Sequence, residues 1–507
     1  MKKHYVLLLF LLGLLNSQSE AQDSIRYLHP VFDDVTVTPD IVYGVNASML
    51  GMLVGDTEAR PEDLLLDLYE PTGDILEERP LVLLFHNGNF LPPAFTGLPT
   101  GTKEDNALVD IATKLAKRGY VVASCNYRLG WNGAADNTPA LLFGIMNAAY
   151  RAIQDGRTAI RFFKKEADTY GIDPNKIVLW GNGTGGFISL GAASLDNYEE
   201  EIVGVLKFYP YGEPVVVDTV NGDIYGTSVG IVPDFYPYWP FPAGDTLNYP
   251  NHVAYSSDFQ MAVNMGGAVG DISWVDENTV PTVSFHVKTD QSTSCYTEIV
   301  TTPPPNNIPI IEVSGSCDYQ TQQALFNNQT EWDGVDWLED YGSEAADITS
   351  VADSRNDGLE GFLPFETDSI ENNAPWDWWQ GVNPALGLSD QATAQATIDS
   401  ALLYFLPRAC ITLGLDCKTT AIDEIVATKI DLRVFPNPAS NRVHFTSKEF
   451  PMEFIRIYDL TGRLVKEYQN IKEYTFEMQK GNLGNGVYFA QVWFKDGFLS
   501  KQIIFQD

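Results

Sequence analysis

The stretch Lys176–Leu190 constrains the fold of this chain more than any other part of the sequence. Its apolar run, Ile177–Trp180, is typical of a buried strand. Four glycines in the next six residues leave room for a tight turn, and the small and apolar residues of Phe187–Ala193 then favour a closely packed helix. This strand–turn–helix pattern predicts an α/β protein with the turn at the carboxyl edge of its sheet.

Two known motifs fit this turn. Gly181–Gly185 have the glycine spacing of G-x-S-x-G, in which a serine nucleophile stands on a strained bend, but Gly183 occupies the serine position. Gly181–Gly186 also spell G-x-G-x-x-G, the dinucleotide fingerprint. That fingerprint belongs after the first strand of a sheet, with an acidic residue about twenty residues on, after the next strand. The only nearby acidic run precedes the next predicted strand, Ile202–Phe208, so dinucleotide binding is kept as an alternative only.

The elements before this stretch alternate between strands and helices, which predicts a parallel sheet with right-handed crossovers. The predicted strands are Asp63–Tyr69, Leu81–Phe85 and Tyr120–Cys125, and the predicted helices are Ala107–Arg118 and Ala148–Tyr170.

The length of 507 residues predicts two or three domains. Met1–Lys3 and the apolar run Tyr5–Leu15 are typical of a secretory signal, with a cleavage site after Ala21. The apolar run is too short to span a bilayer, and no later segment does better. We therefore expect a signal peptide at 1–21, a main domain at 22–420, a linker at 421–430 and a last domain at 431–507, with no transmembrane segment.

The formal net charge of −35 is unevenly distributed. Residues 431–507 hold ten Lys/Arg and nine Asp/Glu, a net +1, which leaves −36 on residues 1–430. A surface this acidic repels nucleic acids and anionic membranes, so neither is expected as a partner.

Five cysteines in an exported chain raise the question of disulfide bonds. Cys295 and Cys317 flank a polar loop, and Cys410 and Cys417 bracket the end of a helix. Two bridges are predicted within these pairs, with Cys125 left as a buried free thiol. Spacing alone also permits all five cysteines to be reduced.

Four ordered motifs carry a family resemblance over residues 60–300. They are His86–Phe90, similar to H-G-G-G-F; Asn126–Gly130, which is N-Y-R-L-G; the loop Tyr170–Pro174; and the strand and turn Pro281–Asp290. In this order they resemble α/β-hydrolases of the carboxylesterase and feruloyl-esterase-like type. The resemblance implies a mostly parallel sheet flanked by helices, with the Pro- and Tyr-rich segment 209–265 as a cap insertion.

The same resemblance assigns positions in a degenerate catalytic site. Asp290 takes the position of the triad acid, and Gly183 takes that of the missing nucleophile. Asn87, Gly88 and the N–H of Thr184 take the oxyanion side. Thr184 is also a substitute nucleophile, although its side chain lies one residue beyond the bend.

The catalytic base is harder to place. In this family it follows the acid, but the only histidine after Asp290 is His444, in the last domain. His252, in the predicted cap, is the possible base. No H-E-x-x-H motif or cysteine cluster suggests a metal site, and no cofactor is implied.

The end of the chain changes to short alternating strands. Val434–Pro438, Phe454–Gly462, Gly486–Phe489 and Lys501–Phe505 resemble a type IX secretion C-terminal sorting domain. The resemblance implies a small all-β sandwich that engages the type IX secretion machinery, so the protein is expected to be secreted or attached to the cell surface. A carbohydrate-binding or immunoglobulin-like module is the alternative.

Two functional classes therefore remain. The first is an exported α/β-hydrolase-fold protein without Ser-His-Asp catalysis, which binds a small-molecule or glycan/ester ligand. The second is a carboxylic ester hydrolase with an unconventional site.

Trp332, Trp337 and Trp376–Trp379 are either ligand platforms or packing residues.

Overall fold

The computed structural model describes residues 25–506, and its gaps are 136, 211, 213, 236–240, 303–306, 336–337, 339–340, 342–344, 346–358, 367–372, 380–388, 418–429, 449, 460–462 and 495–496. The chain divides into two compact units. One is Ser24–Cys417, and the other comprises Lys418–Asp507 together with Met1–Asp23.

An eight-stranded mixed sheet forms the centre of the larger unit, in the order β1-β2-β4-β3-β5-β8-β10-β13. The pairs β1–β2 and β2–β4 are antiparallel, and every pair from β4 to β13 is parallel. The predicted α/β fold is confirmed. The strands are β1 Val35–Ser48, β2 Arg60–Pro71, β3 Arg79–Phe85, β4 Val121–Cys125, β5 Ile172–Asn182, β8 Met261–Met265, β10 Thr282–Val287 and β13 Phe362–Phe365.

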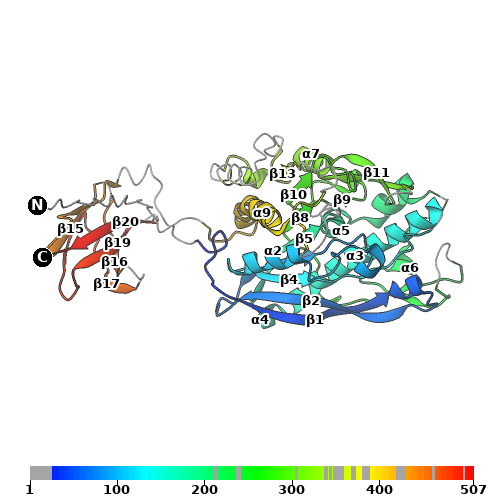
Figure 1. The fold of residues 1–507 in the computed structure, drawn as a ribbon, viewed down its shortest axis with the longest axis horizontal. Helices are drawn as coiled ribbons and strands as arrows, with labels where there is room; N and C mark the ends of the chain where they lie inside the picture. Colours follow the sequence, from blue (N-terminus) through cyan, green and yellow to red (C-terminus); the bar gives the residue numbers. More distant parts are fainter. Residues whose placement is uncertain are drawn as a thin grey trace, which may run out of the picture. The chain divides into compact units, whose positions relative to one another are not determined.

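Helices cover both faces of this sheet (Figure 1). Side chains of a strand alternate between faces, so Leu81 and Leu83 of β3 pack with α3 and α5, whereas Val82 and Leu84 pack with α2 and α9. The flanking helices are α2 Asn106–Ala116, α3 Thr138–Lys165, α5 Thr184–Ser194 and α9 Gln391–Thr412.

The predicted strand Ile202–Phe208 is wrong. The structure has short helical turns there, η2 Glu199–Val203 and η3 Leu206–Phe208, and the next strand of the large sheet is β8. Ile202 and Phe208 are buried, but Leu206 is 86% exposed. An apolar run with one side chain in solvent does not form a strand that is buried on both faces.

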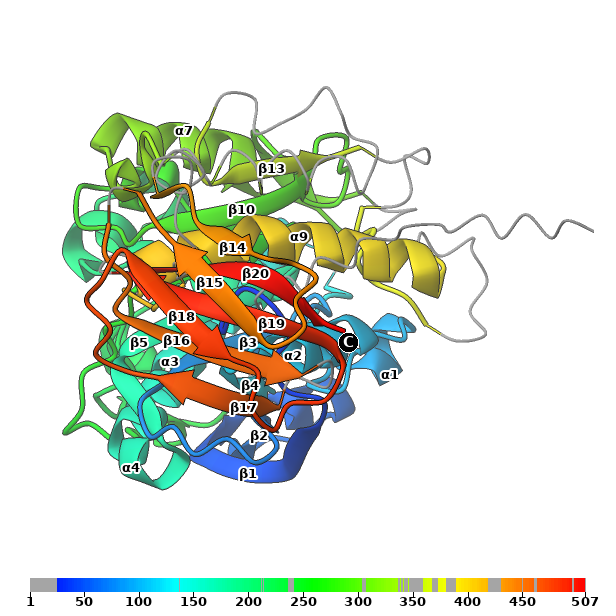
Figure 2. The ribbon, with the colours of Figure 1, turned by 90° about the vertical axis from the view of Figure 1, so that its left-hand side faces the viewer.

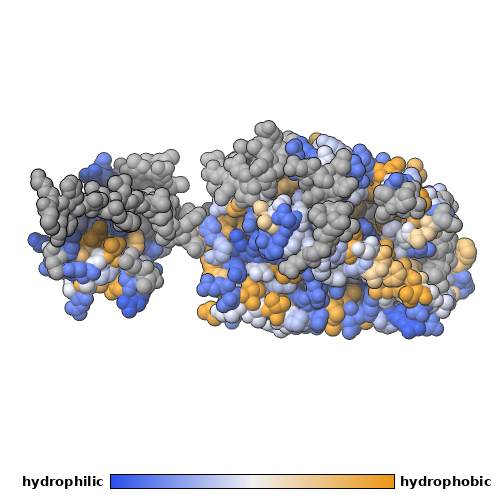
Figure 3. Space-filling model, viewed as in Figure 1, coloured by the Kyte–Doolittle hydropathy of each residue, from blue (hydrophilic) through white to orange (hydrophobic). Residues whose placement is uncertain are grey.

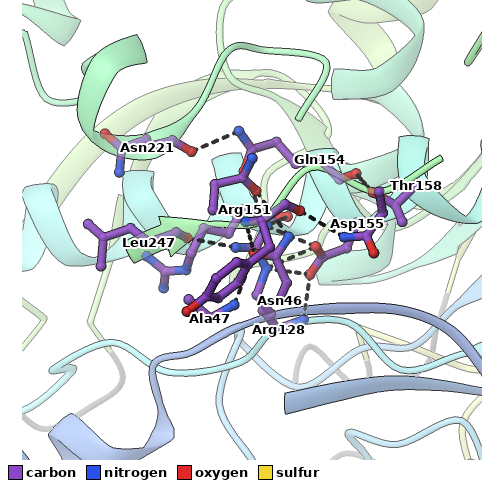
Figure 4. A network of polar contacts seen from close by, with 12 residues as sticks. Asn46, Ala47, Arg128, Arg151, Gln154, Asp155, Thr158, Asn221 and Leu247 are labelled. Carbon is purple, nitrogen blue, oxygen red and sulfur yellow. Dashed lines mark hydrogen bonds and ion pairs between the residues drawn. The ribbon is translucent and has the colours of Figure 1, made fainter. Parts of the chain in front are cut away.

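The motif Asn126–Gly130 anchors α3 through a buried charge (Figure 4). The Arg128 guanidinium forms an ion pair of 2.8 Å with Asp155, and both side chains are fully buried. Arg128 also donates to the backbone carbonyl of Leu247 at 3.1 Å. Because a buried charge requires such partners, this motif ties the loop after β4 to α3.

The smaller unit contains two antiparallel sheets around one apolar core. Strands β16, β19 and β20 run side by side in both ribbon views (Figures 1 and 2). The predicted all-β C-terminal fold is confirmed. The strands are β14 Arg433–Phe435, β15 Arg442–Thr446, β16 Phe454–Asp459, β17 Leu464–Tyr468, β18 Thr475–Gln479, β19 Gly486–Phe494 and β20 Gly497–Phe505.

Hydrophilic and hydrophobic residues are interspersed over the visible face of the larger unit (Figure 3). Among the described residues, no helix is both long and apolar enough to cross a membrane.

Candidate active site at the strand–helix turn

The turn from β5 to α5 has an unusual backbone conformation at Gly183. Its φ is 54° and its ψ is −115°, a region that is costly for any residue with a side chain. The Gly183 N–H donates to the carbonyl of Met265 at 2.7 Å, and the Gly183 carbonyl accepts from the N–H of Gly186 at 2.8 Å. The bend predicted from the glycine spacing is thus present, and glycine is the residue that adopts it most readily.

The neighbouring glycines have a packing role. A Cβ added at Gly181 would overlap the backbone of Gly185, and one added at Gly185 would overlap the carbonyl of Phe85. A Cβ at Gly186 would overlap the side chain of Asn264. Close packing of β5, α5 and the adjacent strands therefore accounts for the G-x-G-x-x-G spacing without a bound phosphate.

The side chain of Asn87 occupies the space beside Gly183. A Cβ built on Gly183 would overlap the Asn87 amide. The Oδ1 atom of Asn87 accepts a hydrogen bond of 3.2 Å from the N–H of Thr184. The amide therefore lies where a nucleophile's side chain would begin. It also accepts a hydrogen bond from one of the N–H groups expected to stabilise an oxyanion.

A buried network holds this amide in place. Asn87 and Asn182 both form hydrogen bonds with the carboxyl group of Asp377, and the Asn182 bond is 2.9 Å long. The indole N–H of Trp376 donates to Asn182 at 2.7 Å. Burial raises the pKa of Asp377 to about 6, and the bonds from the two amides act in the opposite direction. Because each partner is satisfied, the network stabilises Asn87 in this position.

Thr184, the proposed substitute nucleophile, pairs with a hydroxyl group. Its Oγ1 lies 3.2 Å from the hydroxyl of Tyr127. Tyr127 donates its own proton to the carbonyl of His86 at 2.9 Å, so Thr184 is the donor in the pair. Burial raises the pKa of Tyr127, which keeps that phenol protonated. Tyr127 therefore does not act as a base towards Thr184.

Asp290 lies in the turn that follows β10, at the carboxyl edge of the sheet. Its Oδ1 accepts from the N–H groups of Ser292 and Thr293 at 2.7 and 3.0 Å. Burial raises the pKa of Asp290 to about 7, although these two bonds lower it. The second carboxyl oxygen lies 3.7 Å from Nε2 of His286. The histidine beside the acid is thus one that precedes it in the chain.

His286 also contacts a buried serine that the sequence did not single out. Its Nε2 lies 2.8 Å from the carbonyl of Thr293, which only accepts, so Nε2 carries the proton. Its Nδ1 therefore accepts from the hydroxyl of Ser316 at 2.7 Å. Burial lowers the pKa of His286 to about 4. Ser316, His286 and Asp290 form a Ser-His-Asp arrangement, but Ser316 and His286 have 0% exposure.

The structure does not bring His252 to the turn. Its Nε2 lies 2.9 Å from the carbonyl of Tyr43, and its ring packs 5.7 Å from that of Phe162. Phe162 in turn contacts Tyr170, which comes just before β5. His252 is therefore at the amino end of β5, whereas Gly183 follows its carboxyl end.

A cavity of about 1040 Å³ opens beside the turn. Thr184 and Phe187 of α5 line it, together with residues from α3 and from the hairpin of β11 (Thr297–Thr301) and β12 (Pro309–Gly315). Val216 is the residue of the predicted cap segment 209–265 that reaches the described lining. Asp290 does not line it, but the next residues, Gln291–Thr293, do.

The cysteine predictions are confirmed. Cys295 is bonded to Cys317, Cys410 is bonded to Cys417, and Cys125 is a buried free thiol.

The described tryptophans are neither all packing residues nor all exposed platforms. Trp332, Trp376 and Trp378 are buried packing residues, whereas Trp379 is 45% exposed. Trp337 lies outside the described residues.

Two family models match the chain. Residues 66–298 match BD-FAE, and residues 433–506 match the secretion system C-terminal sorting domain. The chain joins an esterase-like BD-FAE domain to a type IX sorting domain. The BD-FAE match contains the Asn87 loop, the Gly183 turn and Asp290, so the candidate site lies largely within it.

Two curated relatives match short segments. Neuroligin-like protein glit-1 of Caenorhabditis elegans is 31% identical over 106 residues, which is 21% of this chain and 12% of the relative. Gut esterase 1 of the same organism is 24% identical over 131 residues, 25% of this chain and 21% of the relative. The matched segment thus spans under a quarter of the length of either relative.

Solved esterase structures are similar at low identity. Thermogutta terrifontis esterase 2 phosphoramylated by tabun has a TM-score of 0.36 and 16% identity, covering 76% of this chain and 97% of that one. A truncated form of a carbohydrate esterase from gut microbiota has a TM-score of 0.30 and 15% identity, covering 57% and 84% respectively.

Proposed function

We propose that the BD-FAE-like unit is an exported binding protein that holds a small molecule in the cavity beside α5 without Ser-His-Asp catalysis. The observation that carries this proposal is the position of Asn87, whose amide occupies the space beside Gly183 and accepts from the Thr184 N–H. A hydrolase of this type needs that space for its nucleophile and that N–H for its oxyanion.

The chemistry of the remaining groups supports the same proposal. Gly183 has no side-chain oxygen, the Thr184 hydroxyl donates to a phenol, and His252 lies at the opposite end of β5. Losing one serine or histidine of a triad typically lowers turnover by on the order of a millionfold, because its members act as a unit. A bound molecule is therefore expected to leave the cavity unchanged.

The sorting domain supports export by the type IX secretion machinery. We further propose that residues 1–21 are a signal peptide, and that the protein is released or held at the cell surface. In this account the smaller unit serves transport and supplies no group to the cavity.

A second candidate function is carboxylic ester hydrolysis at Ser316. The hydrogen bond of 2.7 Å from Ser316 to His286 favours it, since serine activation requires such a bond. The full burial of both side chains opposes it, because an ester must reach Oγ before any acyl transfer.

The two candidates are separated by a short-chain aryl ester assay on the purified protein and on Ser316→Ala. The binding proposal predicts no turnover above the buffer rate by either protein. Turnover by the natural protein that disappears in Ser316→Ala would establish the second candidate. Turnover that persists in the variant would show that another nucleophile acts, and would also contradict the binding proposal.

A further inference from the structure

We propose that the cavity beside α5 selects an uncharged, largely apolar molecule bearing a neutral hydroxyl-type donor, and rejects the carboxylate of the same skeleton. The inference deepens the proposed function, because it rests on the cavity being a binding site.

The walls of the cavity carry no formal charge. None of the described lining residues is Asp, Glu, Lys, Arg or His. Ile145, Met146 and Ile153 come from α3, and Ile310 and Ile311 come from β12. The volume of about 1040 Å³ lies at the upper end of the range of pockets that hold drug-sized ligands. Such a cavity suits a compact apolar body.

The aromatic walls contribute carbon surface. The indole N–H of Trp131 donates to the carbonyl of Asn89 at 2.8 Å, and that of Trp274 donates to the carbonyl of Glu201 at 2.8 Å. The hydroxyl of Tyr150 donates to the carbonyl of Gly222 at 3.0 Å. Since these polar atoms already have protein partners, the rings offer a ligand mainly dispersion and hydrophobic contact.

At the strand–helix turn the available group is an acceptor. Thr184 uses its proton in the bond to Tyr127, which leaves the lone pairs of Oγ1. Ser292 also lines the cavity, and its backbone N–H already donates to Oδ1 of Asp290. A ligand hydroxyl has a proton to donate to Thr184, whereas a carboxylate has only lone pairs.

The charge of a carboxylate ligand also weakens its binding relative to the alcohol. An unpaired carboxylate loses its hydration on entering an apolar cavity, and no described lining cation replaces that hydration. The formal net charge of −35 adds a long-range repulsion for anions. Both effects disfavour the acid relative to the corresponding alcohol.

The test uses two probes with one skeleton, 1-pyrenebutanol and 1-pyrenebutanoate, titrated into the purified full-length protein at neutral pH and followed by pyrene fluorescence. The alcohol is expected to bind about tenfold or more tightly than the carboxylate, since an unpaired buried charge costs well over 1.4 kcal/mol. Neither probe contains an ester, so the result does not depend on catalysis.

Two substitutions locate the binding. Ala149→Trp fills the cavity from α3 and is expected to weaken alcohol binding by about tenfold or more, as lost apolar contact area predicts. Ile145→Lys places a cation in the lining and is expected to reverse the preference towards the carboxylate. Leu325→Lys is the matched control, because Leu325 is an exposed aliphatic residue of α7 (Ser316–Phe326) outside the lining.

Equal or tighter binding of the carboxylate to the natural protein would overturn the inference, and so would a complete lack of alcohol binding. Alcohol binding that survives both Ala149→Trp and Ile145→Lys in folded protein would place it elsewhere and would also overturn the inference. These outcomes are separate from catalysis: ester turnover would contradict the proposed function while leaving the ligand preference intact.

Discussion

The Oδ1 atom of Asn87 accepts a hydrogen bond of 3.2 Å from the N–H of Thr184, which sets the Asn87 amide against the bare Cα of Gly183. In the proposed function, this one side chain fills both the expected nucleophile position and part of the expected oxyanion position. We propose that the turn keeps the strained backbone of a hydrolase turn, while the Asn87 side chain fills the space that covalent chemistry would need.

Gly183→Ser is expected to destabilise the protein and to create no efficient esterase. A side chain at φ 54° costs on the order of 1–3 kcal/mol, and the overlap with Asn87 adds to it. Urea unfolding of Gly183→Ser, Asn87→Gly and the double variant measures the coupling between the two positions.

In that cycle the double variant is expected to lose less stability than the sum of the two single variants, because Asn87→Gly removes the overlap. Additive losses would show that the amide does not occupy the position ascribed to it. Ester turnover by the double variant is still expected to be low, since His252 lies at the opposite end of β5 and Nδ1 of His286 already accepts from Ser316.

The buried carboxyl group of Asp290 predicts that stability falls as the pH rises. Burial raises the folded-state pKa of Asp290 to about 7 from its ordinary value of 3.8, so the folded state binds a proton that the unfolded state releases. The stabilisation is therefore fully present below pH 3.8 and is lost as the pH rises through about 7.

Asp290→Asn is expected to reduce this pH dependence. Unfolding free energies of both proteins, measured by urea titration between pH 4.5 and 7.5, should show a smaller decline for the variant. An unchanged slope would indicate that Asp290 is ionised throughout. His286 has a lowered pKa, so its own contribution is lost on acidification and acts in the opposite direction.

The Cys295–Cys317 bond is expected to stabilise the hairpin that lines the cavity. It joins residues 22 apart in sequence, whereas Cys410–Cys417 joins residues 7 apart. Constraint of the unfolded chain grows with loop length, so replacing the first pair by serines should cost roughly 3 kcal/mol and more than replacing the second. Peptide mapping without reduction identifies the bonds, and a linkage to Cys125 would contradict these pairs.

Deletion of residues 431–507 is expected to retain the protein in the periplasm with the larger unit folded. The described residues of 24–417 form their own apolar clusters, of which two are large, and the C-terminal strands have a separate one. Cell fractionation with an antibody to the larger unit measures the outcome. Efficient release of the truncated protein into the medium would contradict the sorting function.

Much of the fold follows from local patterns. The strands Leu81–Phe85 and Ile177–Trp180 are buried on both faces, so continuous apolar runs identify them. The same rule fails at Ile202–Phe208, because an apolar run does not reveal that Leu206 faces solvent. Tertiary packing determines that difference.

The site was predictable only in part. The glycine spacing locates the bend at Gly183, and the family resemblance of Pro281–Asp290 singles out Asp290. The role of Asn87 depends on Asp377, far away in sequence, and the Ser316–His286 contact spans 30 residues. Such hydrogen bonds leave no periodic signal in the sequence, so only the folded arrangement shows them.

In the proposed function, no described group at the turn or in the cavity acts as a serine-type nucleophile. Intact-mass analysis after incubation with a fluorophosphonate probe tests it most directly, with an active serine esterase as the positive control. The natural protein is expected to keep an unchanged mass. A stoichiometric adduct on Ser316, on Thr184 or on another residue that lines the cavity would show that a serine-type nucleophile acts.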